Sequence, residues 1–400
     1  MIRIRFAGLA LVAGLLAACG GGATPPASSA PASAPAPASA AASAKPAASA
    51  AAGSASAKPA ASASAKPAAS GAASASAKPA ASGNLTKVSV GVVASSSDGG
   101  IFIAQDRGYF KDQGLDVETM RFNTLVDMVA PVGAGQLDIA AGGLAAGLYN
   151  AIGRDVPVRI VADKGGTPSP EWDFTALMIR KDLVDSGKVK DFKDLKGLKL
   201  VTSGKGNSPE VGLATALKKG GLTLKDVDFE QIGFPDMVTA FANKGIDGAI
   251  VIEPFVSSIE AAGTAVRWKT NLDIFGHNEQ IAVIAYGQKM FSNQDLGRKW
   301  MTAYVKGLRD YNDAFGPKKK NTDDVVKILI NHTAVKDPKV YAKMKPAGLD
   351  PNGKLDVSSM QEDIDYYQQA GELKDKPDLT KLIDTSFQQY AVQQLGPYQP

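Results

Sequence analysis

The chain has 400 residues, with 44 Lys and Arg, 40 Asp and Glu, and a formal net charge of +4 at pH 7. The first 83 positions hold 6 of the basic residues and no acidic one, which leaves 38 basic and 40 acidic residues in the rest. The positive excess therefore belongs to the N-terminal segment and predicts no nucleic-acid surface. A single cysteine excludes an internal disulfide, so we expect an ordinary hydrophobic core.

The N-terminus has the pattern of an export signal. Arg3 and Arg5 precede an apolar run from Phe6 to Ala18, shorter than the roughly 20 residues that span a membrane. The "LAAC" that ends at Cys19 resembles the bacterial lipoprotein signal, in which the cysteine is diacylated. We expect a signal peptide over 1–18 and an exported protein, lipid-anchored through Cys19 to the extracytoplasmic face of the cell membrane. The alternative is a secretory signal with an incidental cysteine.

Residues 19–83 form a low-complexity segment. They are almost wholly Ala, Ser, Pro, Gly and Lys, and the motif "SAKPAAS" recurs in them. Such a composition offers too little apolar surface to bury a core. We expect a disordered linker between the anchor and a folded domain that begins near residue 84.

From residue 84, strand-like and helix-like segments alternate, which predicts an α/β fold with helices covering a largely parallel sheet. Gly114, between a predicted helix and strand, is expected to cap the helix in the left-handed conformation. A second α/β series follows, and beyond Ser292 amphipathic helices are expected to pack back on the core. The predicted strands are 87–94, 115–122, 137–143, 156–166, 174–183, 226–233, 247–253, 264–270 and 280–291; the predicted helices include 100–114, 125–135, 145–154, 208–221, 236–245 and 254–263.

Four segments follow one another in an order that resembles a known family. They are "IAQDRGYFKDQGLDVE", "AGQLDIAAGG", "DFKDLKGLKLVTSGKGNSPE" and "PDMVTAFANKGIDGAIVIEPF". The resemblance is to the solute-binding proteins of ABC importers for sulfonates, taurine, nitrate and thiamine-pyrimidine precursors. It implies a two-lobed periplasmic-binding-protein type 2 fold, hinged by two crossover strands and completed by C-terminal helices. Lobe one is then 84–178 with 280–400, and lobe two is 179–279.

Two loops of the expected first lobe carry candidate ligand-binding residues, because ligands of open α/β sheets bind beyond the carboxyl ends of the strands. The loop "SSSDGG" offers hydroxyls, although serine there also serves as a helix cap. The loop "AGGL" lets backbone N–H groups approach an anion, or else merely allows tight packing. The candidates are Ser95, Ser96, Ser97, Gly142, Gly143 and Leu144.

The loop "SGKGNSPE" gives the strongest signal for an anion site. Gly204, Gly206, Asn207 and Ser208 lead into Pro209, which suits the start of a helix. Free N–H groups at that helix end are expected to face the cleft and to favour a sulfonate, carboxylate or phosphate. The loop lacks the Walker GK[ST] ending and the third glycine of a dinucleotide fingerprint.

Four further residues point to other ligand features. Glu253 suits an amine or ring N–H, or else complements the N-terminus of the next helix, where Phe255 lies. Trp172 offers a stacking face for a flat ligand, or else packs on the lobe surface. Asp236 is expected first as a helix N-cap and second as a ligand contact.

The family also includes a pyrimidine-forming enzyme with a cysteine-rich motif, which this chain lacks. His277 and His332 fit no metal-ligand spacing, so we expect no enzyme, no metal and no cofactor. The expected protein is a monomer that delivers a small organic anion to an ABC permease and its ATPase. The alternatives are a binder of an aromatic heterocycle of the pyrimidine or flavin type, a ligand-sensing receptor module, and a pyrimidine-synthesis-like enzyme.

Overall fold

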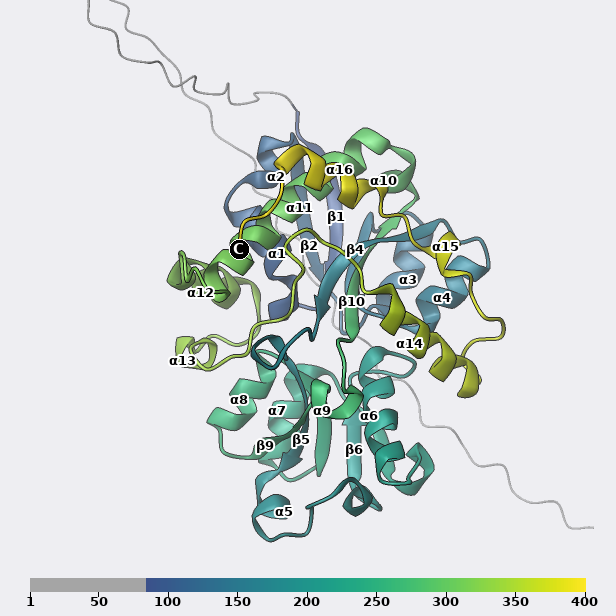
Figure 1. The fold of residues 1–400 in the computed structure, drawn as a ribbon, viewed down its shortest axis with the longest axis vertical. Coiled ribbons are helices and arrows are strands. Elements are labelled where there is room, and N and C mark those ends of the chain that lie inside the picture. The colour runs from purple at the N-terminus through teal and green to yellow at the C-terminus, as the bar shows by residue number, and fades with distance from the viewer. Residues whose placement is uncertain (1–83) are drawn as a thin grey trace, which may run out of the picture. The chain divides into compact units, whose positions relative to one another are not determined.

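The structure is a computed structural model that describes residues 84–400 (Figure 1). The predictions for the signal peptide, for Cys19 and for the linker lie outside the described residues. Within 84–400, none of the helices combines the length and the apolar character needed to cross a membrane.

The first lobe is built on a five-stranded sheet. Its strands are β1 (Thr86–Val92), β2 (Leu115–Arg121), β3 (Ile139–Gly143), β4 (Val158–Gly166) and β10 (Gln280–Gly287). They are arranged in the order β2-β1-β3-β10-β4, with β1 parallel to β2 and β3, and β10 antiparallel to β3 and β4. The carboxyl ends of β1, β3 and β4 therefore meet at one edge of the sheet.

The second lobe repeats this arrangement. Its strands are β5 (Thr175–Arg180), β6 (Lys199–Thr202), β7 (Asp228–Gln231), β8 (Gly248–Ile252) and β9 (Ala265–Thr270). Their order is β7-β6-β8-β5-β9, and β5 runs antiparallel to both of its neighbours. The boundary expected between residues 178 and 179 falls inside β5, whose pairing partners all belong to the second sheet.

The sequence predicted largely parallel sheets, whereas both sheets are mixed. The reason is the same in each lobe. β5 and β10 enter their sheets from the side that faces the other lobe, where the neighbouring parallel strands end, so each runs in the opposite direction. The chain passes between the two sheets twice, over residues 167–174 and 271–279, which confirms the two-lobed α/β fold with two crossovers.

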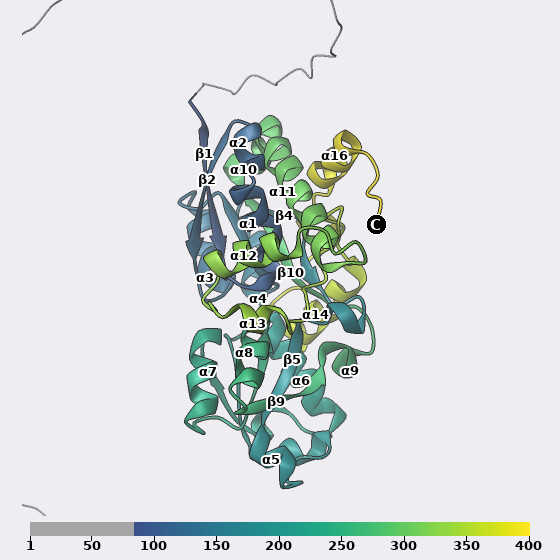
Figure 2. The ribbon, with the colours of Figure 1, turned by 90° about the vertical axis from the view of Figure 1, so that its left-hand side faces the viewer.

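Helices cover the sheets of both lobes (Figures 1 and 2). The first lobe has α1 (Gly99–Asp106), α2 (Tyr109–Asp112), α3 (Val126–Gly133) and α4 (Ala146–Gly153). The second has α5 (Lys181–Asp185), α6 (Ser208–Lys219), α7 (Phe234–Ala242), α8 (Phe255–Ala261) and α9 (Asn271–Phe275). The single helix predicted over 100–114 is interrupted at Gly108, whose φ is 75°, and Gly114 adopts the predicted left-handed conformation with a φ of 76°.

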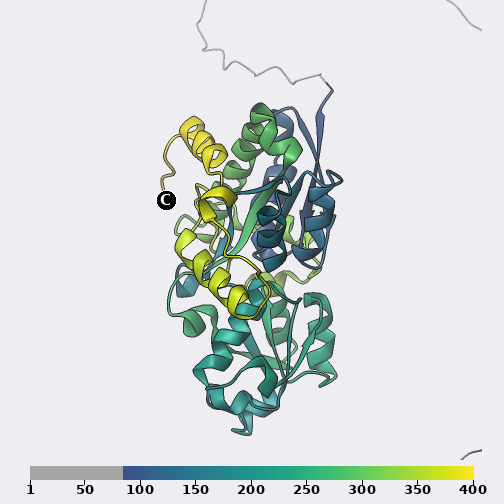
Figure 3. The ribbon, with the colours of Figure 1, turned by 90° about the vertical axis from the view of Figure 1, so that its right-hand side faces the viewer.

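The C-terminal region is helical, as the sequence predicted. Its helices are α10 (Gln288–Ser292), α11 (Gln294–Phe315), α12 (Thr322–His332), α13 (Pro338–Tyr341), α14 (Val357–Gln369), α15 (Leu379–Leu382) and α16 (Ser386–Leu395). The long helix α11 packs against α1 and α16 and buries Trp300 and Tyr304 in the core of the first lobe. A β-carbon on Gly307 would lie only 2.0 Å from the Gly100 carbonyl oxygen, so this helix crossing requires glycine. Helix α14 reaches the second lobe and contacts α6 (Figure 3).

Candidate functional site

A narrow cavity of about 40 Å³ lies between the two lobes. Its walls come from loops at the facing edges of both sheets, which is where ligands bind in open α/β folds. The polar lining residues are Ser95, Ser97, Asn123, Thr124, Lys164, Ser203, Asn207 and Ser208. The apolar lining residues include Val93, Leu125, Phe174, Pro209, Phe234, Ile252 and Ile281.

Lys164 supplies the positive charge that lines this cavity. Its side chain is 1% exposed, and its Nζ lies 3.0 Å from Asp98 Oδ1 and donates to Ser97 Oγ at 2.7 Å. An ammonium group has three N–H donors, so two partners leave one for a ligand. Asp98 is fully buried behind the lysine, and its Oδ2 accepts the backbone N–H of Ser95 at 2.9 Å.

Sequence reasoning missed both members of this ion pair. The available signal was a lysine inside the buried strand pattern "VRIVADKGG", because a buried lysine needs an acidic partner. The neighbouring Asp163 points elsewhere and accepts N–H groups from Gly165, Gln280 and Asp350 at 2.6 to 2.8 Å. Burial raises the pKa of Asp163 to about 7, although these donors oppose the shift.

The predicted serines divide between two roles. Ser95 and Ser97 line the cavity, and their Oγ atoms lie 2.9 Å apart. Ser96 instead joins the lobes, because its N–H and its hydroxyl both donate to the backbone oxygen of Glu253, at 3.1 and 3.0 Å.

The loop that begins α6 lies at the cavity, but its amides are not free. Asn207 and Ser208 line the cavity, and Asn207 Oδ1 caps the N–H of Glu210 at 3.3 Å. The N–H of Ser208 donates to the Leu144 oxygen at 2.9 Å, and that of Gly206 donates to Glu210 Oε2 at 3.1 Å. The expectation of free N–H groups at this helix end is therefore wrong for these positions, because the helix cap and the other lobe use them.

The glycine loop after β3 serves mainly as a contact between the lobes. Gly143 lines the cavity, whereas a β-carbon on Gly142 would lie 2.8 Å from Leu125 Cβ, which fits the alternative of tight packing. Leu144 is fully buried, and its backbone bonds to Ile281 and Ser208. Gly206, in the left-handed region with a φ of 63°, accepts the Ala146 N–H at 2.9 Å. A β-carbon on Gly204 would lie 3.1 Å from side-chain atoms of Thr124 and Asn207.

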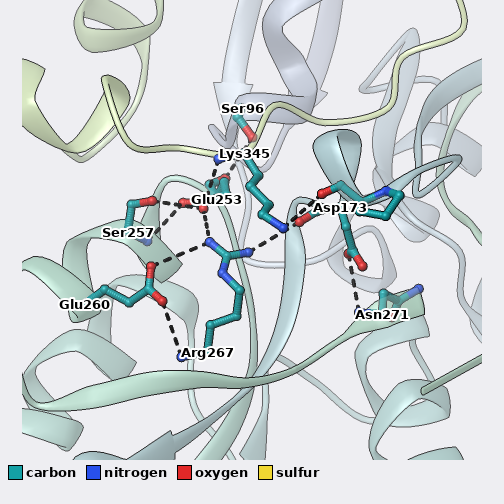
Figure 4. A network of polar contacts seen from close by, with 9 residues as sticks. Ser96, Asp173, Glu253, Ser257, Glu260, Arg267, Asn271 and Lys345 are labelled. Carbon is teal, nitrogen blue, oxygen red and sulfur yellow. Dashed lines mark hydrogen bonds and ion pairs between the residues drawn. The ribbon is translucent and has the colours of Figure 1, made fainter. Parts of the chain in front are cut away.

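Glu253 lies beside the cavity at the centre of a buried polar network (Figure 4). Its carboxylate accepts the N–H and hydroxyl of Ser257, at 3.0 and 2.9 Å, and Arg267 Nη2 at 2.6 Å. Ser257 belongs to the first turn of α8, so the second interpretation, a carboxylate that complements a helix start, describes this contact. Burial raises the pKa of Glu253, although Arg267 opposes the shift.

The other predicted contacts lie away from the cavity. Phe255 stacks on the lining residue Phe234, with ring centroids 6.1 Å apart, and so supports the cavity wall from behind. Trp172 packs near Tyr311, with centroids 6.4 Å apart, on another face of the first lobe. Asp236 is exposed, and the N-cap of α7 is Gly233, because the helix begins at Phe234 rather than after Asp236.

A family model described as "NMT1/THI5 like" matches residues 96–313, more than half of the chain. The chain belongs to the NMT1/THI5-like family. Its fold also matches that of solved binding proteins. The nitrate-binding protein of Synechocystis aligns with a TM-score of 0.62 and 14% identity over 78% of this chain and 89% of that one. The alkanesulfonate-binding protein of Xanthomonas axonopodis, solved with bound MOPS, aligns with a TM-score of 0.59 and 14% identity over 77% and 99%.

Curated relatives of this chain differ in what they are named for. A Brucella abortus protein named as a candidate binding protein is 28% identical over 214 residues, 53% of this chain and 62% of that relative. A 4-amino-5-hydroxymethyl-2-methylpyrimidine phosphate synthase of Aspergillus parasiticus is 29% identical over 155 residues, 38% and 41% of the two chains. The chain thus matches less than two thirds of each relative, and the relatives include an enzyme.

Proposed function

We propose that this protein is an extracytoplasmic solute-binding protein that delivers a small organic anion to an ABC importer and is tethered through a lipid on Cys19. The observation that carries the proposal is the cavity between the lobes, which is lined by a buried lysine and closed by direct contacts between the lobes. The names of the structural neighbours, for nitrate and alkanesulfonate binding, support the same class of function.

The proposed ligand carries one acceptor group on an apolar body. A carboxylate or sulfonate oxygen fits the third N–H of Lys164, next to the hydroxyls of Ser95 and Ser97. Asp98 offsets the lysine charge, and the amides of Ser208 and Gly206 are already bonded, so a bare inorganic oxyanion gains little here. The apolar walls favour a ligand with an apolar body, because binding removes that apolar surface from water.

A flat aromatic body is the second candidate. The rings of Phe174 and Phe234 both line the cavity. Phe174 ends the first connection between the lobes, and Phe234 begins α7 in the second lobe. Aromatic faces stack on planar ligands and contribute roughly 0.5–1.5 kcal/mol beyond the area they bury. An aromatic carboxylate, or a heterocycle with an acceptor oxygen, can stack on the rings and accept a hydrogen bond from Lys164.

Closure of the lobes is the proposed mechanism of capture. The contacts of Ser96 with Glu253 and of Ser208 with Leu144 join the lobes on two sides of the cavity. A ligand that touches both lobes binds the closed form better than the open form, which shifts the population toward closure. Moving that population from 1:99 to 99:1 takes about 5.5 kcal/mol of differential affinity.

The test is thermal unfolding of the full chain with MOPS, taurine, benzoate, an aminopyrimidine and nitrate, each added in turn. A true ligand at one hundred times its Kd adds about 2.7 kcal/mol to the free energy of unfolding. We expect stabilisation by an organic anion, with benzoate above nitrate. Stabilisation by nitrate alone would contradict the proposed ligand class, and conversion of a ligand into product would contradict the binding function.

A further inference from the structure

Glu372, which follows α14 in the first lobe, is covered by the start of α6 in the second lobe. Its Oε2 atom is buried and has no hydrogen-bond partner within residues 84–400. A β-carbon on Gly206 would lie 2.7 Å from that oxygen, so the carboxylate faces the Gly206 backbone closely. Its Oε1 atom lies 3.9 Å from Lys205 Nζ, and the lysine side chain is 72% exposed.

A second carboxylate lies on the other side of the same glycine. Glu210, on α6, is 3% exposed and accepts the Gly206 N–H at 3.1 Å and the Tyr366 hydroxyl at 3.0 Å. Tyr366 and Tyr367 are the titratable groups that α14 presents here, and α4 contributes the Asn150 amide, which donates to the Glu372 backbone oxygen at 2.7 Å. Lys205 is thus the cation that faces Glu372 among these elements.

The surroundings of Glu372 depend on closure. Burial, and then the charge of Glu210, raise the pKa of Glu372, whereas Lys205 lowers it. Lys205, Gly206 and Glu210 belong to the second lobe, so separation of the lobes removes them and returns the carboxyl group to water. In water its pKa returns toward the ordinary value of about 4.3.

We propose that closure of the two lobes takes up a proton at Glu372, so that acidity favours the closed form and alkalinity favours release. This inference deepens the proposed function and rests on the two lobes closing over a ligand. The closed form gains fully below the ordinary pKa of the carboxyl group and loses this gain as pH rises through the closed-form value. One proton changes the ratio of closed to open protein by at most about tenfold per pH unit.

The experiment measures the distance between the lobes without any ligand. Donor and acceptor dyes are placed by Lys111→Cys and Lys188→Cys, both exposed positions, in the full chain with Cys19→Ser. We expect energy transfer to rise as pH falls from 8 to 5. Glu372→Gln, which mimics the protonated form, should remain closed throughout, whereas Asp375→Asn at an exposed position should follow the unmodified chain. A flat profile in the unmodified chain, or an unchanged one in Glu372→Gln, overturns the proposal.

A second variant gives an independent readout. Lys205→Gln removes the cation that lowers the pKa of Glu372, so the midpoint of closure should move to higher pH. An unmoved midpoint contradicts the role of Glu372. Because no ligand is used, a flat pH profile together with ligand stabilisation rejects the proton inference alone, whereas pH-dependent closure without ligand stabilisation rejects the proposed function alone.

Discussion

Two pairs of buried ionisable side chains differ in how their charges are accommodated. Asp98 and Lys164, at the cavity, are at most 1% exposed and form an ion pair at 3.0 Å. Glu279, at the second crossover, and Asp363, on α14, are at most 2% exposed, and in the described part of the chain no N–H or hydroxyl group donates to their four carboxyl oxygens.

The comparison of the two pairs shows which of them carries charge in the folded protein. Burial raises the pKa values of both Glu279 and Asp363, and for Glu279 the charge of Asp363 adds to the shift. The like pair therefore holds protons and stays close to neutral, as an internal part of the fold. In the opposite pair each charge lies beside its partner, and this pair reaches the cavity through Lys164.

Among substitutions tested at pH 7, breaking the opposite pair should be the most destabilising. Lys164→Met leaves the Asp98 carboxylate buried without its cation, and such losses typically cost about 3–5 kcal/mol. Urea unfolding at pH 7 should show a free energy of unfolding that is lower by this amount. The double variant Asp98→Asn with Lys164→Met removes both charges and should recover most of it. A double variant as unstable as the single one would show that packing, not charge, stabilises this site.

An intermediate effect is expected at Asp163, a buried acid without a cation. Its Oδ1 accepts from Gly165 and Gln280 and its Oδ2 from Asp350, so the amide of Asp163→Asn must face at least one N–H donor. An unsatisfied buried donor costs about 1–3 kcal/mol. Chemical denaturation should report a loss in that range, smaller than for Lys164→Met. No loss would mean that the network rearranges freely.

The like pair should also make the free energy of unfolding depend on pH. Raised folded-state pKa values give Asp363 and Glu279 stability that is present below their ordinary values and is lost as pH rises through the folded values. Lowering the pH from 8 to 5 should raise the free energy of unfolding by about 1.4 kcal/mol per unit for each bound proton. Asp363→Asn should flatten this profile and stabilise the chain at pH 8.

The control is Asp365→Asn, an exposed position on the same helix, where a partner lysine lowers the pKa of the carboxyl group. In this control variant the free energy of unfolding should still rise as the pH falls from 8 to 5. If Asp363→Asn also leaves this rise in place, the like pair is not the source of the pH dependence.

Much of the fold could be predicted from sequence because it depends on local signals. The alternation of apolar runs located every strand from β1 to β10 except β6, and Gly114 marked a helix end. The antiparallel direction of β5 and β10 could not be predicted in this way, because it follows from which side of the sheet the chain enters. The sequence also predicts a helix through Gly108, yet the φ of 75° at this residue interrupts the helix.

The candidate site was harder to predict, since it depends on contacts between distant segments. Of the residues chosen by loop position, five line the cavity: Ser95, Ser97, Gly143, Asn207 and Ser208. The same rule selected Ser96, Leu144 and Gly206, which join the lobes instead. A polar residue after a strand faces either a ligand or the opposite lobe, and the sequence of one strand does not distinguish them.

The most direct test compares the affinity of the unmodified chain and of the Asp98→Asn, Lys164→Met double variant for the organic anion that stabilises the chain most. Isothermal titration calorimetry gives both values at pH 7. We expect a loss of about 10- to 100-fold, since a charge-assisted hydrogen bond contributes about 1.5–3 kcal/mol. Equal affinities would contradict the claim that the ligand binds between the lobes at Lys164.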